Sequence, residues 1–322
     1  MSLWAEGKPK IVIAHPFFDI KSIVETWENP PSCVQVSNKT ELLEHLPDAE
    51  ILVTVTLWER RFLALAPQLK LLQSISSGVN QYDLDDFRER GVALCSARGV
   101  NAAAVAEHAI GLTLNLSRQL AADRDAQRAH QWRRLSADRA LRRRELDGAH
   151  AVIVGFGAIG SRLAALCLAF GMRVTVVRQN AAAPTDLDVS VEPHERFADA
   201  ASSADYVLLT CPATPETIGM LNAAVLDRMK PSAIVINVAR GQIIVEADLI
   251  AALVQGKIAG AGLDTFEREP LPGDSPLWDM PNVMISPHGA GDTTEYEARV
   301  AHLLRENARR IALGESLINQ VA

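Results

Sequence analysis

The sequence has few cysteines, and none stands in a pattern typical of a metal site. Its 322 residues include four cysteines, and no two of them form a C-x-x-C pair or another metal-ligand spacing. The apolar runs around Cys95 and Cys167 predict buried, unpaired thiols. Free thiols are typical of a reducing compartment, so we expect an intracellular protein without a metal centre.

Long apolar runs and an excess of positive charge are also missing. No stretch reaches membrane-spanning length without polar interruption, and the opening MSLWAEGKPK lacks the apolar core of a signal peptide. The formal net charge of −7 argues against a nucleic-acid-binding surface. We therefore expect a cytoplasmic protein whose function needs neither a membrane nor a nucleic acid.

The composition is that of an ordinary soluble globular protein, with 48% apolar and 22% charged residues. In the first hundred residues, short apolar runs alternate with amphipathic helical stretches at 39–46 and 59–65. This alternation predicts parallel strands joined by crossover helices. Strands are expected at 10–14, 51–56, 69–76 and 91–97.

A second alternating unit follows a nearly uncharged, Ala- and Leu-rich helix expected at 101–121. The pattern predicts a doubly wound sheet, and a last amphipathic helix is expected at 294–314. The strands of this second unit are expected at 151–155, 173–178, 205–211, 232–238, 259–264 and 282–286. Its helices are expected at 158–170, 194–202, 222–229 and 246–255.

The segment 124–146 is dense in arginine. Such a run is typical of a solvated or subunit-contacting segment. A nucleic-acid patch is the alternative, which the acidic total charge disfavours.

The stretch AVIVGFGAIG has the pattern of a dinucleotide-binding turn. Gly155, Gly157 and Gly160 follow an apolar strand and open a helix. In such a turn the first glycine permits the tight bend, the second lets the backbone approach the pyrophosphate, and the third lets helix and strand pack closely. The amides near Ala158 and Ile159 at the helix N-terminus would bind the phosphates.

Arg178 ends the next predicted strand, where an NAD-binding protein usually has an acid. An acid there would bind the ribose hydroxyls, whereas an arginine offers charge-assisted hydrogen bonds to a 2′-phosphate. The residue therefore favours NADP(H), with NAD(H) as the alternative if the arginine contacts nothing.

Three later loops carry side chains suited to hydride-transfer chemistry. Arg240, Asp264 and His288 each follow a predicted strand, and parallel strands place their carboxyl ends at one edge. His288 could transfer the hydroxyl proton, Glu269 could orient it, and Arg240 could bind a substrate carboxylate. Each also has an ordinary structural explanation: a turn, the end of a helix or a capped loop.

At these residues the sequence resembles the D-isomer-specific 2-hydroxyacid dehydrogenases, and within them the glyoxylate and hydroxypyruvate reductases. The matching segments, in the family's order, are VGFGAIGSRLA, CPATPETIGMLN, MKPSAIVINVARG, AGAGLDTFEREPLP and NVMISPHGAG. The chain departs from the family pattern at Asn80, where many relatives have Asp, in HGAG, and at Arg178.

The resemblance implies roles for further residues. Arg240, Glu269 and His288 would be the catalytic trio, and Asp264 would contact the nicotinamide carboxamide. The backbone amides of Ser77 and Gly78 would bind the substrate carboxylate, together with Arg240 and His288. The residues expected along the cofactor are Cys211, Pro212, Thr217, Val238 and Ala290.

The resemblance also implies an α/β fold of two doubly wound parallel-sheet domains with a cleft between them. A flavodoxin-like substrate-binding domain would comprise 1–99, completed by 289–322, and a Rossmann-type dinucleotide-binding domain 100–288. Relatives are typically homodimers joined through the cofactor domains. The expected function is NADPH-dependent reduction of a small 2-keto acid, with His288 as proton donor.

Two other functions remain open from the sequence. Oxidation of a small inorganic anion such as phosphite would use the same trio, whereas formate dehydrogenases have glutamine where Glu269 stands. A non-enzymatic, dinucleotide-sensing binding protein is the second alternative, although such proteins tend to have an acid at the position of Arg178.

Overall fold

The computed structural model describes residues 8–322, which divide into two compact units. The first unit ends at Asn101 and resumes with Thr293–Ala322, and the second is Ala102–Asp292. The stretch examined for a signal peptide includes residues 1–7, which lie outside the described residues. Within 8–322, no helix combines the length and the apolarity that crossing a membrane requires.

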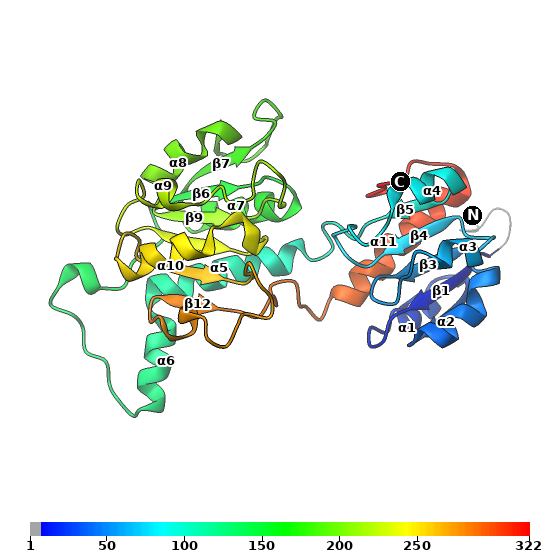
Figure 1. Cartoon of the computed structure of the whole chain (residues 1–322), viewed down its shortest axis with the longest axis horizontal. Helices are drawn as coiled ribbons and strands as arrows, with labels where there is room; N and C mark the ends of the chain where they lie inside the picture. Colours follow the sequence, from blue (N-terminus) through cyan, green and yellow to red (C-terminus); the bar gives the residue numbers. More distant parts are fainter. Residues whose placement is uncertain (1–7) are drawn as a thin grey trace. The chain divides into compact units, whose positions relative to one another are not determined.

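The first unit contains a parallel sheet with the strand order β2-β1-β3-β4-β5 in the described residues (Figure 1). The strands β1, β3 and β4 are apolar and almost completely buried, as their sequences predict. The bounds are β1 Lys10–Ala14, β2 Ser32–Val36, β3 Ile51–Thr54, β4 Leu71–Ser74 and β5 Ala93–Cys95.

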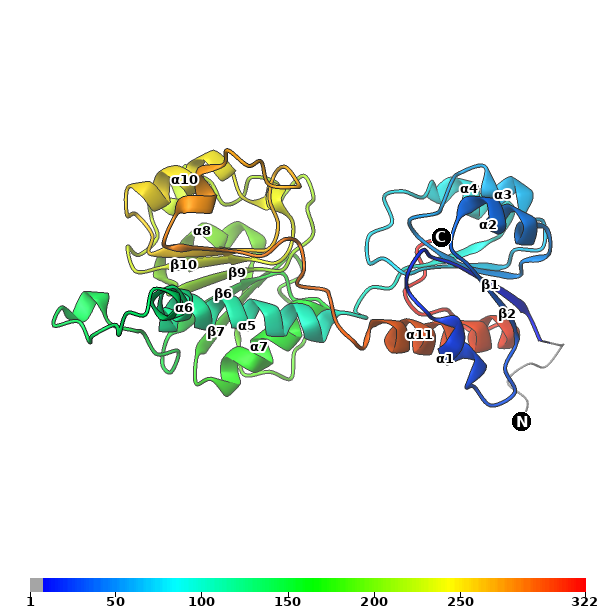
Figure 2. The ribbon, with the colours of Figure 1, turned by 90° about the horizontal axis from the view of Figure 1, so that it is seen from below.

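Helices cover both faces of this sheet (Figure 2). One face packs against α2, α3 and α4 around Phe62 and Phe87, and the other packs against α1 and α11 around Ile13 and Leu304. The bounds are α1 Lys21–Glu25, α2 Lys39–His45, η1 Leu46–Asp48, α3 Phe62–Leu65, α4 Leu84–Arg90 and α11 Tyr296–Leu313.

The second unit contains a wider parallel sheet, with the order β12-β11-β10-β9-β6-β7-β8. Strands β6 and β9 lie at its centre and are buried throughout. The bounds are β6 His150–Val154, β7 Arg173–Arg178, β8 Ser190–Pro193, β9 Tyr206–Leu209, β10 Ile234–Asn237, β11 Gly260–Leu263 and β12 Val283–Ile285.

Two helical layers enclose this second sheet as well (Figure 2). The layer of α5 and α7 buries one apolar cluster, and the layer of α8, α9 and α10 buries another. The helix bounds are α5 Ala102–Arg118, α7 Ala158–Ala169, α8 Phe197–Ser203, α9 Ala223–Leu226 and α10 Glu246–Val254. The 3-10 turns are η2 Arg139–Leu141, η3 His194–Arg196, η4 Gly241–Ile243 and η5 Pro276–Asp279. The predicted pair of doubly wound parallel-sheet α/β units is confirmed.

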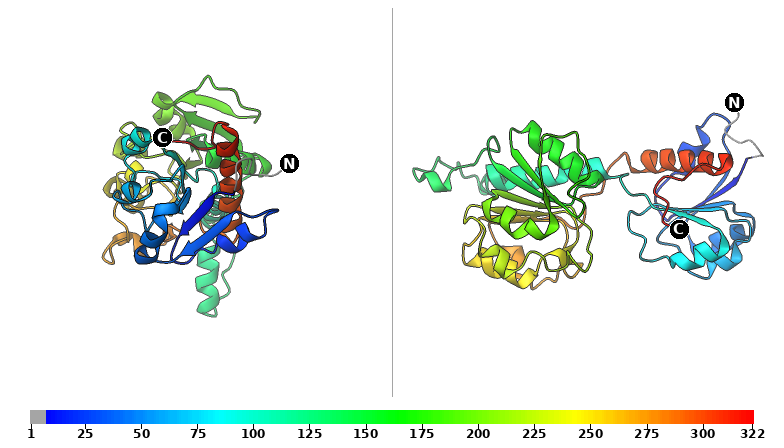
Figure 3. Two further views of the ribbon diagram at one scale, coloured as in Figure 1. Left: turned by 90° about the vertical axis from the view of Figure 1, so that its right-hand side faces the viewer. Right: turned by 90° about the horizontal axis from the view of Figure 1, so that it is seen from above.

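The arginine-rich segment projects away from the second sheet (Figure 3). The helix expected at 101–121 ends at Arg118, because Gln119 adopts a left-handed conformation with φ 56° and starts a new helix, α6 (Leu120–Arg128). Arg133 and Arg143 each lie 2.7 Å from the carboxylate of Asp123. Part of the positive charge is therefore neutralised within the segment itself.

Two strands were not expected from the sequence, β2 and β8. Each lies at an edge of its sheet and is only partly buried, so neither has the continuous apolar run that marks the central strands. Several other elements are shorter than predicted; the helix expected at 59–65 forms only as α3. Sequence patterns locate buried elements better than their frayed ends.

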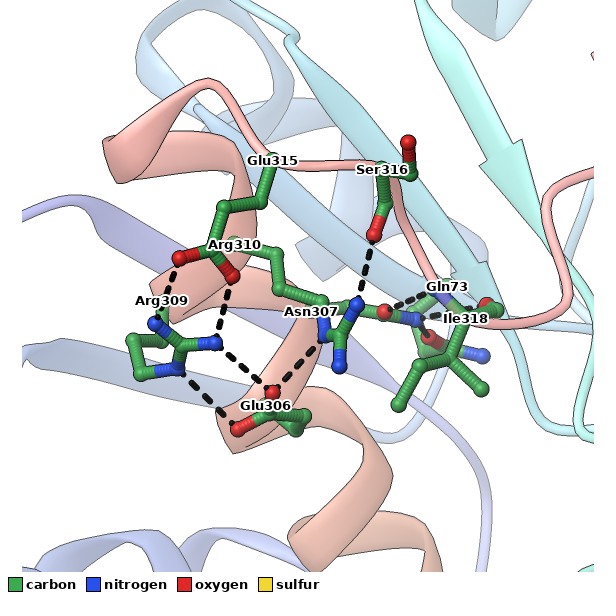
Figure 4. Close-up of polar contacts among 8 residues, drawn as sticks. All are labelled: Gln73, Glu306, Asn307, Arg309, Arg310, Glu315, Ser316 and Ile318. Carbon is green, nitrogen blue, oxygen red and sulfur yellow. Dashed lines mark hydrogen bonds and ion pairs between the residues drawn. The ribbon is translucent and has the colours of Figure 1, made fainter.

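The C-terminal tail is attached to the first unit by a buried amide (Figure 4). The side chain of Asn307 on α11 is fully buried and donates to Gln73 Oε1 at 2.9 Å and to the Ile318 carbonyl at 3.1 Å. It also accepts from the Ile318 amide at 2.8 Å. The amide thus joins α11, β4 and the tail.

A partly exposed ion-pair cluster lies beside this buried contact (Figure 4). Arg309 bridges Glu306 and Glu315, and Arg310 also pairs with Glu306. Hydrogen bonds from Arg309 and then Arg310 lower the pKa of Glu306 to about 2. Exposed pairs of this kind contribute little to folding free energy.

We therefore expect Asn307→Ala to destabilise the first unit far more than Arg309→Ala. The alanine at 307 leaves the buried Gln73 oxygen without this partner, at a cost of about 1–3 kcal/mol, and also removes two hydrogen bonds to the half-buried backbone of Ile318. Hydrogen exchange of residues 317–322 should accelerate in Asn307→Ala and stay near wild type in Arg309→Ala. Equal acceleration in both variants would contradict this account.

Candidate active site

The glycine turn lies between β6 and α7, and two of its three glycines are required by packing. A Cβ at Gly155 would lie 2.7 Å from the Cys211 nitrogen, and a Cβ at Gly160 would lie 2.0 Å from the Gly155 oxygen. Gly155 also has φ +93°, which side chains disfavour. A Cβ at Gly157, in contrast, would meet no atom within 4 Å among the described residues.

That open position fits the approach of a dinucleotide pyrophosphate to the backbone. Gly157 is the N-cap of α7 and contributes no side-chain hydrogen bond to the first turn. The amides of Ala158 and Ile159 begin this helix of 12 residues, where amides lack acceptors within the helix. The turn thus has the geometry expected of a phosphate cradle.

Arg178 ends β7 and lies against the same turn. Its guanidinium carbon lies 5.3 Å from the centre of the Phe156 ring. Its Nη2 donates to the Ala183 carbonyl, while its buried Nε has no hydrogen-bond partner among the described residues. A partly buried cation with an unused donor fits an anionic ligand group at this position.

His288 and Glu269 form the shortest link between the catalytic candidates. Nδ1 of His288 lies 2.7 Å from Oε2 of Glu269, and Oε1 of Glu269 accepts from the Phe266 amide at 3.0 Å. The carboxylate therefore fixes the orientation of the ring and leaves Nε2 for another partner. The imidazole is half exposed, so it remains accessible to a ligand.

Asp264 holds the loop in which His288 lies. Its side chain is buried and accepts hydrogen bonds from the Ser286 hydroxyl and from the amides of Gly289 and Ala290, at 2.6, 2.9 and 3.0 Å. Its backbone carbonyl accepts from the His288 amide at 2.9 Å. A carboxylate has about four acceptor sites, so one remains for a cofactor amide.

Arg240 lies on a turn packed tightly against the loop of Glu269. The turn follows β10, and the guanidinium is exposed apart from a contact between Nη1 and the Ala239 carbonyl at 2.7 Å. A Cβ on the next residue, Gly241, would lie 1.8 Å from the carbonyl carbon of Phe266. The two loops therefore meet backbone against backbone.

A reciprocal pair of carboxylates also joins these two loops. The Glu246 amide donates to Glu267 Oε1 at 3.0 Å, and the Glu267 amide donates to Glu246 Oε2 at 3.2 Å. Burial raises the pKa of Glu246, and the nearby charge of Glu267 raises it further. No sequence pattern indicates this contact, because Glu246 begins α10 and Glu267 lies 21 residues later on the loop after β11.

The remaining cofactor candidates line the same sheet edge in the second unit. Val238 and Ala290 are buried in one apolar cluster, and the Cys211 backbone packs on Gly155. Thr217 Oγ1 donates to the Pro212 carbonyl at 2.6 Å and so shapes the loop after β9. Burial raises the pKa of the Cys211 thiol to about 11, which keeps it protonated and unreactive.

The substrate-loop candidates lie in the first unit, after β4. Ser77 is exposed, and its hydroxyl lies 3.5 Å from the Ala97 carbonyl. The Gly78 amide, expected to bind a carboxylate, donates instead to Ser76 Oγ at 3.2 Å. No group of three His, Cys, Asp or Glu within residues 8–322 could hold a metal ion.

Comparison with known proteins identifies the family. Residues 110–290 match the model for the NAD binding domain of the D-isomer specific 2-hydroxyacid dehydrogenases. The chain belongs to this family. The resemblance predicted from the sequence is thereby confirmed, and the glycine turn and the His288–Glu269 pair lie within the matched NAD binding domain.

Individual members of the 2-hydroxyacid dehydrogenases agree with this assignment. The chain is 34% identical over 280 residues to D-3-phosphoglycerate dehydrogenase of Mycobacterium leprae, covering 86% of this chain and 52% of the relative. It thus spans about half the length of that protein. It is 31% identical to glyoxylate reductase of Pyrococcus furiosus, covering 92% of this chain and 89% of the relative.

A solved structure of a family member has the same fold over nearly the whole chain. The D-isomer specific 2-hydroxyacid dehydrogenase from Xanthobacter autotrophicus Py2, in complex with NADPH and MES, aligns with a TM-score of 0.78 and 27% identity. The alignment covers 98% of each chain.

The tight contact at Gly241 predicts that this position tolerates no side chain. We expect Gly241→Ala to lower the free energy of unfolding by about 1–3 kcal/mol or more, since the added carbon meets rigid backbone. Gly273→Ala in a neighbouring loop is the control, because a Cβ there meets no described atom within 4 Å. Thermal unfolding measures both; equal midpoints would refute the packing argument.

Proposed function

We propose that this chain is an NADPH-dependent reductase that converts a small 2-keto acid, of the glyoxylate or hydroxypyruvate type, into the D-2-hydroxy acid. The observation that carries the proposal is the 2.7 Å contact between His288 Nδ1 and Glu269 Oε2, which leaves Nε2 for a substrate proton. The likeness to glyoxylate reductase of Pyrococcus furiosus over most of both chains supports the substrate class.

Reduction of a carbonyl group requires a hydride at carbon and a proton at oxygen. The dinucleotide supplies the hydride when it is bound. His288 donates the proton from Nε2 to the developing alkoxide, and the Glu269 carboxylate stabilises the imidazolium before transfer. The exposed guanidinium of Arg240 binds the substrate carboxylate with its planar fork and polarises the carbonyl.

In this proposal the two units have different ligand-binding roles. The first unit binds the substrate through the loop at Ser77 and Gly78, and the second unit binds the dinucleotide. The remaining acceptor site of Asp264 takes the nicotinamide carboxamide. Side chains along the cofactor are those of Cys211, Pro212, Thr217, Val238 and Ala290.

Arg178 supports NADPH over NADH, which remains the alternative cofactor. Its guanidinium lies against the Phe156 ring beside the glycine turn, and its buried Nε has no hydrogen-bond partner among the described residues. This positive charge would attract the negatively charged 2′-phosphate of NADPH. The family member from Xanthobacter autotrophicus Py2 was solved with NADPH. Four free cysteines support a reducing, cytoplasmic location.

Steady-state reduction of glyoxylate and hydroxypyruvate with each cofactor tests the proposal. We expect turnover with a clear preference for NADPH, and Arg178→Gln should lower kcat/KM for NADPH by about tenfold or more. NADH kinetics should change little. Arg173→Gln at the exposed start of the same strand is the matched control. No turnover with either acid, or an equal loss with both cofactors, would contradict the proposal.

We also propose that a second copy of this chain covers the projecting segment together with the start of α6, residues 120–146. Leu120, Trp132, Leu135 and Leu141 expose 51%, 94%, 88% and 64% of their surface, which is unusual for one short segment of a monomer. Two-fold homodimers are the commonest soluble oligomers.

Sedimentation equilibrium of wild type and Trp132→Ser checks this assembly. We expect a dimer for wild type and a shift toward monomer for Trp132→Ser, because the indole would lose its buried partner surface. Phe17→Ser is the control, since Phe17 is 72% exposed in the first unit, outside the segment. A monomeric wild type would end the proposal.

A further inference from the structure

A histidine outside the predicted trio is linked to the catalytic loop. His108 lies on α5, and its Nε2 is 2.7 Å from the hydroxyl of Ser286, which follows β12. The same hydroxyl lies 2.6 Å from Oδ1 of Asp264, which follows β11. Three segments far apart in the sequence thus form one chain of hydrogen bonds.

The direction of donation follows from the number of protons available. The Asp264 carboxylate accepts from the amides of Gly289 and Ala290, so it acts as an acceptor. The hydroxyl of Ser286 has a single proton, and its 2.6 Å contact gives that proton to Asp264. Ser286 Oγ can then only accept from His108, so Nε2 of His108 bears a proton and donates it.

These hydrogen bonds also stabilise the buried negative charge of Asp264. The side chain of Asp264 is 2% exposed, and a buried carboxylate is costly unless hydrogen bonds and an opposite charge compensate it. His108 Nε2 lies 3.7 Å from Oδ1, so its N–H points positive charge density toward the carboxylate, and the contact becomes an ion pair when the imidazole is protonated. His108 is 30% exposed and so connects the buried carboxylate to the outer surface of α5.

The loop held by Asp264 is strained at the catalytic position. His288 has φ +52°, a left-handed conformation that a non-glycine residue adopts only when its surroundings enforce it. Its amide donates to the carbonyls of Asp264 and Ser286, at 2.9 and 3.0 Å. Contacts that fix the positions of Asp264 and Ser286 therefore also fix the backbone of His288.

We infer that His108 is a positioning residue: through Ser286 it fixes the Asp264 carboxylate, and through Asp264 the backbone of His288. The consequence for rate rests on the proposed function, in which His288 donates the proton. A small misplacement of a catalytic group costs a large factor in rate, even when the cause lies outside the site.

Kinetics of four variants test the link: His108→Leu, His108→Gln, Ser286→Ala and the double variant His108→Leu/Ser286→Ala. Leucine removes the donor, so kcat for the 2-keto acid should fall about tenfold with little change in KM. Glutamine presents an N–H donor and should restore most of kcat. The double variant should lose no more than Ser286→Ala alone, because both changes break one chain.

Hydrogen exchange gives a readout that needs no catalysis. The amides of Gly289 and Ala290 donate to Asp264, so their exchange should accelerate in His108→Leu and Ser286→Ala and stay near wild type in His108→Gln. His302→Leu, which removes an exposed histidine from α11, is the control for loss of an imidazole.

Each result decides the inference. Additive losses in the double variant, failure of glutamine to restore kcat, or wild-type exchange in His108→Leu would overturn it. If His108→Leu does not fold, Ser286→Ala breaks the same chain by deleting one oxygen, and wild-type kcat and exchange there would overturn it equally. A wild-type protein without keto-acid turnover refutes the proposed function, while the exchange data still decide the positioning.

Discussion

Parallel pairing of the strands in the second unit is the constraint on which the candidate site depends. Because β12, β11, β10, β9, β6 and β7 run in one direction, the loops that follow them leave the sheet at one edge. No single loop carries all of the candidate site residues. This edge brings together separate segments that carry candidate residues at or shortly after the ends of their strands: Gly155, Arg178, Arg240, Asp264 and His288.

Alignment at an edge brings loops near one another, but hydrogen-bond precision requires closer contacts. The backbone of Gly241 meets Phe266, whose amide in turn holds Glu269. Asp264 holds the loop of His288 by side-chain and main-chain contacts. Contacts between backbones and buried carboxylates have few alternative arrangements, so they fix the His288–Glu269 pair better than flexible side chains on the surface would.

The sequence predicts the central elements well because burial leaves a clear pattern. The strand expected at 173–178 forms as β7 with those bounds, and the helix expected at 158–170 forms as α7. The edge strands β2 and β8 escaped prediction because half-exposed strands lack a continuous apolar run. The break at Gln119 also escaped, since a left-handed residue between two helical patterns has no local signal unless it is glycine.

The same reasoning separates the parts of the site that the sequence predicts from those it does not. The glycine turn and the residues that follow strands are local patterns, so spacing alone predicts them. His108 lies in the middle of an Ala- and Leu-rich helix, where nothing in its neighbourhood indicates a partner 178 residues away. Residues that orient a catalytic group contact it through other segments, and their role follows only from the proton count of a folded network. In this network the Ser286 hydroxyl has a single proton, which it donates to Asp264, so the hydrogen bond between Ser286 and His108 must be donated by His108.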